Sequence, residues 1–97
     1  MEYDWDPAKN DENLQRRGFD FAFASQIFRG IYVQYPDDRA DYGERRMIAL
    51  GLAEGLPLSV VFTDRIRTDG TQVRRIISAR VSNRKERTRY GKAIQVL

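Results

Sequence analysis

The stretch Gln72–Tyr90 constrains the fold of this chain most, because it has the pattern of a strand that leads directly into a basic helix. Val73–Val81 is rich in β-branched residues, as expected of a central strand. Asn83, followed by Glu86 three residues later, forms a variant of the capping box and predicts that a helix begins there. The first turns of this helix carry four basic residues: Arg84, Lys85, Arg87 and Arg89.

Charge is divided unevenly along the 97 residues. Residues 1–43 carry nine acidic and five basic side chains, whereas residues 65–97 carry ten basic and two acidic ones. Most of these bases are arginines, whose planar guanidinium groups suit phosphate. The C-terminal third therefore predicts a surface for nucleic acid or for an acidic protein. The alternative is an ordinary solvated helix face.

The chain contains neither cysteine nor histidine. Disulfides, thiolate chemistry, histidine metal sites and imidazole catalysis are therefore excluded, and we expect no cofactor. No apolar run approaches the roughly 20 residues of a membrane span. The N-terminus, MEYDWD, is acidic where a signal peptide would be basic. We therefore expect a cytoplasmic protein.

The remaining pattern predicts an α+β domain over residues 1–97, since a second core would not fit in this length. Asp6 and Pro7 begin the first helix, and Asp20 caps the second. The expected helices are Pro7–Arg17, Phe21–Phe28 and Arg84 to about Ile94. The expected strands are Glu2–Trp5, Ile31–Tyr35, Arg46–Leu52, Leu58–Thr63 and Val73–Val81. We expect an antiparallel meander with the helices on one sheet face, leaving an arginine-lined face free for a ligand.

Two expectations concern packing. Ala8, Leu14 and Asn13 should form the inner side of the first helix. The phenylalanines of the second helix should belong to the core and not to a base-stacking platform.

Three groups of motifs resemble one known family over nearly the whole chain. The N-terminal motif is Tyr3-Asp4-Trp5-Asp6-Pro7-Ala8-Lys9, followed by Asn13-Leu14, Gly18, Phe21, Ala24 and Phe28. The middle motif is Glu44-Arg45-Arg46 with Gly51. The C-terminal motif is Phe62-Thr63, then RIISAR over Arg75–Arg80, then Glu86-Arg87 and Tyr90.

With these motifs the chain resembles the BrnT toxins of bacterial type II toxin–antitoxin modules. The resemblance implies a RelE-like fold and a ribonuclease that inhibits translation. It also implies a cognate antitoxin, typically a ribbon-helix-helix DNA-binding protein, and a complex that binds its own operator DNA. The chain departs from the family pattern in two places: Arg16-Arg17 replaces a usual Lys-His, and Ala22 replaces a usual Glu.

RNA cleavage without a metal needs a base for the 2′-hydroxyl, cations for the phosphorane and an acid for the leaving oxygen. Arg75, Arg80 and Arg84 are our candidates for the transition-state charge. Lys9 and Tyr90 are candidate proton-transfer groups, Lys9 only if it is desolvated or crowded by cations. The candidate carboxylate bases are Glu54 and Asp64. Four further cations are expected to bind RNA: Arg74, Arg65, Lys85 and Arg87.

Strand geometry creates a difficulty for this site. In a regular strand Arg75 and Arg80 lie on opposite faces. Either a bulge intervenes, or one of them pairs with an acid such as Glu44 or Glu86. We favour Arg80 on the active face.

Two other functions remain open on the sequence. One is a binding module that holds RNA or an acidic antitoxin segment without catalysis. The other is a degenerate toxin copy, suggested by Arg17 and Ala22, that keeps the fold and antitoxin binding but has lost activity.

Overall fold

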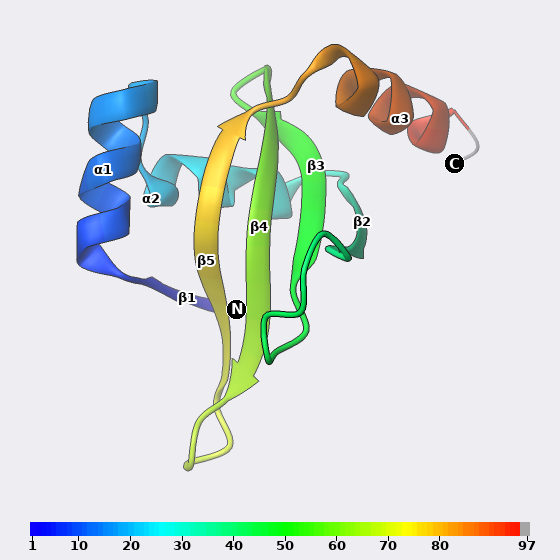
Figure 1. The fold of residues 1–97 in the computed structure, drawn as a ribbon. Coiled ribbons are helices and arrows are strands. Elements are labelled where there is room, and N and C mark those ends of the chain that lie inside the picture. Colours follow the sequence, from blue (N-terminus) through cyan, green and yellow to red (C-terminus); the bar gives the residue numbers. More distant parts are fainter. Residues whose placement is uncertain (96–97) are drawn as a thin grey trace.

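The structure is a computed structural model that describes residues 1–95. Five strands form one sheet in the order β1-β5-β4-β3-β2 (Figure 1). Their bounds are β1 Glu2–Trp5, β2 Val33–Pro36, β3 Met47–Ala53, β4 Leu56–Ile66 and β5 Gln72–Val81. β1 is parallel to β5 and the other pairs are antiparallel. The predicted α+β fold with an antiparallel meander is therefore confirmed, with one parallel strand at the edge.

The helices begin where the sequence predicts. Asp6 caps α1 (Pro7–Arg17) by accepting a hydrogen bond from the Ala8 amide at 3.0 Å, and Gly18 ends it with φ 82°. Asp20 caps α2 (Phe21–Ala24). The single second helix that we expected is instead a short α-helix continued by the 3₁₀ helix η1 (Ser25–Arg29). α3 (Arg84–Ile94) has the predicted bounds and a complete capping box.

The main core lies between the sheet and the α2–η1 segment, which crosses behind the strands in Figure 1. Phe21, Ile27 and Phe62 are almost fully buried there, so the predicted core role of the phenylalanines is confirmed. A second cluster, on the opposite face, contains Leu50 and Val61 with Tyr90 of α3 packed against it. The expectation that all helices cover one face is therefore wrong: α3 packs on the other face.

The first helix contacts the rest of the protein through a polar residue. Asn13 is buried and its amide nitrogen donates to the Phe19 carbonyl at 2.9 Å, whereas Leu14 is 48% exposed and Ala8 is also exposed. Of the three residues expected to face inward, only Asn13 does so. The reason is that α1 lies beside the edge of the sheet and does not cover its face (Figure 1).

One extra residue in β5 resolves the difficulty over the arginines. Val61 pairs with Ser78 but Phe62 pairs with Ile76, so Ile77 is left without a partner. Arg75 and Arg80 lie opposite Thr63 and Ser59, which are four residues apart on β4 and so point to the same face. The bulge that we gave as one alternative is present, and it places both arginines on the face opposite α2.

Gly51 of β3 lies directly against Ile27 of η1, and we expect Gly51→Ala to destabilise the fold. A Cβ at Gly51 would lie 2.9 Å from the Ile27 Cβ and 3.3 Å from the Tyr32 Cβ. Overpacking of this kind should lower the free energy of unfolding by about 1–3 kcal/mol in urea titrations. Gly30→Ala is the matched control, because nothing lies within 4 Å of its Cβ position. Equal stability of the two variants would contradict this account.

Candidate active site

A cleft opens where β5 lacks a neighbouring strand. β1 pairs only with Val73–Ile76, so the second half of β5 forms the edge of the sheet. α1 lies beside this edge (Figure 1), and the space between them is a cleft of about 360 Å³. Its lining residues are Lys9, Glu12, Asn13, Arg16, Arg17, Phe21, Ile77, Ser78, Ala79 and Arg80.

α1 contributes three cations to this cleft. Arg16 and Arg17 follow Lys9 by seven and eight residues, about two helical turns, so the three cations lie on one helix face. Arg16 donates to Glu12 at 3.0 Å, and both side chains of this pair are exposed. Lys9 and Arg17 form no ion pair with the residues that the structure describes. Two cations of the cleft are therefore available to a ligand.

Arg80 is positioned from the other side by the first turn of α3. Its Nη1 and Nη2 donate to the two carboxylate oxygens of Glu86 at 2.6 and 2.7 Å. Glu86 also accepts from the Asn83 amide at 2.9 Å as part of the capping box. Burial raises the pKa of Glu86, but the hydrogen bonds from Arg80 and the Asn83 backbone outweigh burial and hold that pKa below its ordinary value. The carboxylate stays charged and fixes the guanidinium.

A smaller hollow of about 90 Å³ continues past Lys9 toward the other end of β5, where Arg46, Arg65 and Arg75 line it. Arg46 and Arg65 both donate to Glu44, at 3.3 and 3.0 Å. These bonds, the one from Arg65 foremost, hold the pKa of Glu44 below its ordinary value despite partial burial.

Arg75 approaches the Asp4 carboxylate at 3.4 Å, and Asp4 Oδ1 is buried without a hydrogen bond. The cations of this hollow are thus largely neutralised within the protein.

The structure places Arg74 away from the cleft. It is only 8% exposed and lies on the α2 side of the sheet, over the rings of Phe28 and Phe62. Asp64 accepts two hydrogen bonds from it at 2.8 and 2.9 Å, and these bonds raise the pKa of Arg74. Packing and charge pairing account for both Arg74 and Asp64, and we leave them out of the site.

Glu54 and Tyr90 also lie outside the cleft. Glu54, with φ 49°, is the first residue of the two-residue turn between β3 and β4 and accepts from Gln26 at 3.1 Å. The Tyr90 hydroxyl donates to the Ile31 carbonyl at 2.8 Å, and its ring packs against the second hydrophobic cluster. Each has a clear structural contact where it lies.

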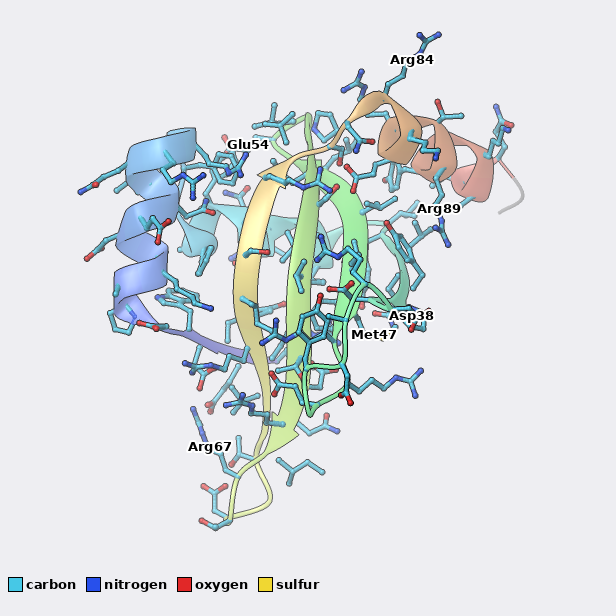
Figure 2. The ribbon with its side chains drawn as sticks, viewed as in Figure 1. Asp38, Met47, Glu54, Arg67, Arg84 and Arg89 are labelled. Atoms are coloured by element: carbon cyan, nitrogen blue, oxygen red, sulfur yellow. The ribbon has the colours of Figure 1, made fainter. Side chains whose placement is uncertain are left out.

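The predicted α3 cations project from the C-terminal helix. Arg84 points away from the sheet at the start of α3 in Figure 2, and Lys85 is exposed beside it. Arg87 donates to the Ser82 carbonyl at 2.8 Å. Of the predicted site residues, the main cleft thus brings together Arg80 and Lys9.

Sequence reasoning did not assign a role to Glu12, Arg16 or Arg17 in the site. The signal that could have found them was the helical spacing from Lys9, at three, seven and eight residues. In the sequence, Arg16 and Arg17 stand out only as departures from the family pattern.

The fold and the cleft define a small basic α+β protein with a cationic site suited to a polyanion. In the described part of the chain, no helix is long and apolar enough to cross a membrane, and no three acidic side chains converge as metal ligands would. The family described as "Ribonuclease toxin, BrnT, of type II toxin-antitoxin system" matches residues 5–86.

The chain therefore belongs to the BrnT family, which confirms the resemblance seen in the sequence. It is a ribonuclease toxin, and this class implies an RNA substrate and a cognate antitoxin. No curated protein matches the sequence.

We expect Glu86→Gln to lower stability in a pH-dependent way. Because the pKa of Glu86 is below its ordinary value of 4.5, its stabilising contribution is present above that pH. The contribution is lost as the pH falls through the lowered pKa. The variant should lose about 1–3 kcal/mol of unfolding free energy at pH 7, and the difference should shrink by pH 3.

Urea titrations at the two pH values measure this difference. Asp11→Asn is the control, since Asp11 is an exposed carboxylate on α1 without an ion pair among the described residues. A difference that does not vary with pH would contradict the assigned role of Glu86.

Proposed function

We propose that this toxin cleaves RNA without a metal ion, in the cleft between α1 and β5, and that it thereby inhibits translation. The observation that supports this proposal is the meeting of α1 cations and Arg80 at an open sheet edge. The 2′-oxygen attacks the adjacent phosphorus while the bond from phosphorus to the 5′-oxygen breaks. The products are a 2′,3′-cyclic phosphate and a 5′-hydroxyl.

Arg80 and Arg17 stabilise the charge on the phosphorane from opposite walls of the cleft. Glu86 fixes Arg80 from one side, so this guanidinium reorganises little during the reaction. Arg75 remains a candidate for binding the neighbouring phosphate, because the bulge puts it on the same face as Arg80. Arg65 would extend this contact from the smaller hollow. Both would first have to loosen their contacts with Asp4 and Glu44.

Proton transfer falls to two residues three apart on α1. Glu12 is the carboxylate that lines the cleft, and it accepts the proton of the 2′-hydroxyl. The Lys9 ammonium is exposed but shares the cleft with three other cations, Arg16, Arg17 and Arg80, and it donates a proton to the leaving 5′-oxygen. Arg17 cannot take the proton-transfer role of a histidine, because a guanidinium does not deprotonate at accessible pH. Charge stabilisation is therefore its role in this proposal.

The antitoxin neutralises the toxin by covering the same cleft. An acidic segment or an inserted helix would exclude RNA both sterically and electrostatically. We propose a ribbon-helix-helix antitoxin, an operator-binding complex and a cytoplasmic location, where the RNA substrate lies. A neighbouring reading frame for such a protein would support this partner, and failure of its product to inhibit cleavage would exclude it.

We expect Arg80→Ala to reduce RNA cleavage by about 10²–10³-fold while the protein stays folded. Purified protein is incubated with RNA in the presence of a chelator, and the products are examined for cyclic phosphate ends. Arg80→Ala combined with Glu86→Gln avoids an unpaired buried carboxylate and should show the same loss. Arg67→Ala is the control, because Arg67 is exposed in the β4–β5 loop and pairs with Glu2.

Full cleavage by folded Arg80→Ala would remove Arg80 from the site. If the unmodified protein binds RNA but does not cleave it at any concentration, the non-catalytic binding module is the correct function.

The departures from the family pattern give a further test. If this chain is a degenerate copy, Arg17→His combined with Ala22→Glu should create cleavage activity that the original protein lacks. Our proposal expects cleavage before the change. Because the double change removes a guanidinium that stabilises the phosphorane, the cleavage rate of the variant should fall. Initial cleavage rates of the original protein and the double variant on one RNA distinguish a degenerate copy from an active toxin. Ala22→Glu alone is the control.

A further inference from the structure

A strongly basic surface on α3 lies apart from the cleft, and we call it the α3 basic face. It is formed by Arg84, Lys85, Thr88, Arg89 and Lys92, which border a shallow hollow of about 600 Å³. The last four residues follow Arg84 by one, four, five and eight positions, so all five lie on one side of the helix. Four of the five carry a positive charge.

No carboxylate neutralises this face within residues 1–95. The only acid in α3, Glu86, is buried and held by Arg80. Arg84, Lys85, Arg89 and Lys92 form no ion pair with a described residue. By contrast, Arg46, Arg65, Arg67 and Arg75 all have acidic partners. Among the described residues, the four unpaired cations on this one helix therefore exceed the two, Lys9 and Arg17, that the cleft offers.

The α3 basic face is connected to the cleft through one ion pair. Arg80 lines the cleft and binds Glu86, which lies in the first turn of α3 directly after Arg84 and Lys85. From there the face runs along the helix to Arg89, whose guanidinium lies 3.6 Å from the centre of the Tyr35 ring. Figure 2 shows Arg84 and Arg89 along the helix. The cleft and the start of this face are thus joined through the contact between Arg80 and Glu86.

We infer that the α3 basic face is a second RNA-binding surface, which holds the phosphates of the strand outside the cleft. This inference rests on the proposed RNA cleavage in the cleft. From Arg84 to Lys92 the helix rises about 12 Å, a length along which a stacked strand presents about four phosphates.

The composition of the face favours RNA over a protein partner. Protein interfaces are anchored mainly by buried tryptophan, tyrosine and arginine side chains, and they are depleted in lysine. The five residues of this face include no aromatic side chain, and two of its four cations are lysines, Lys85 and Lys92. Phosphate binding needs only cations, and it releases counterions from the nucleic acid. Most of the face also lies beyond residue 86, where the family match ends.

The test compares two triple variants that lose the same charge. Arg84→Gln, Lys85→Gln and Lys92→Gln remove the α3 cations but keep Arg89 on Tyr35. Arg29→Gln, Arg45→Gln and Arg67→Gln remove three exposed arginines elsewhere. The probe is a 12-nucleotide single strand with 2′-O-methyl sugars, which cannot be cleaved by 2′-oxygen attack. Its affinity is measured by fluorescence anisotropy from 50 to 300 mM salt, and circular dichroism checks the fold.

We expect the α3 variant to bind the probe about tenfold more weakly at low salt. The slope of log affinity against log salt should become less steep by about 2. Each of the three lost phosphate contacts contributes roughly 0.7 to that slope. The control variant should keep the original slope. Cleavage of dinucleoside monophosphates, which are too short to reach α3, should be unchanged in the α3 variant.

An unchanged slope in the α3 variant, or an equal fall in both variants, would overturn the inference. So would loss of affinity for the antitoxin without loss of affinity for the probe, because the face would then bind protein. Failure of the unmodified protein to cleave dinucleoside monophosphates and long RNA would reject the catalytic proposal, and the slopes alone would then decide the inference.

Discussion

The pairing between β4 and β5 is the constraint on which the site depends. β4 is continuous, and one unpaired residue, Ile77, shifts the register of β5 against it. Before the shift Ile76 faces the main core, and after it Ala79 does. Arg75 and Arg80 therefore reach the same face, although their spacing in the sequence would separate them. The bulge keeps the apolar side of β5 buried and puts Arg75 and Arg80 on one face.

Arg74 and Arg80 of β5 each form a two-point ion pair with a carboxylate, but the two pairs have different roles. Arg74 is enclosed by aromatic rings and Asp64, so its charge is used within the core. Arg80 has a similar two-point contact with Glu86, but it lines an open cleft and its side chain is 36% exposed. Because Glu86 also completes the capping box of α3 with Asn83, the start of that helix and the position of Arg80 are linked. A change that loosens the cap should therefore disturb the cleft.

The sequence predicted the elements well because their ends carry local signals. Asp6-Pro7, Asp20 and Asn83 with Glu86 are such signals, and each helix begins where they stand. The site was predicted only in part. Arg74 lies on the core side of the sheet because of how β5 pairs with β4. The local sequence pattern does not predict this pairing. The grouping of Lys9 with Arg80 depends on α1 lying beside a particular sheet edge, which follows from tertiary packing.

The short first strand has a consequence for how this fold holds a substrate. Asp6 ends β1 after four residues, and Pro7 could not have continued the ladder because it has no amide hydrogen. The second half of β5 therefore has no neighbouring strand on this side, because the chain begins a helix at Pro7. A nucleotide chain entering there would occupy the path of a strand that the protein does not build. The cleft in this fold arises because the chain leaves the sheet early to form α1, and it needs no added loop or domain.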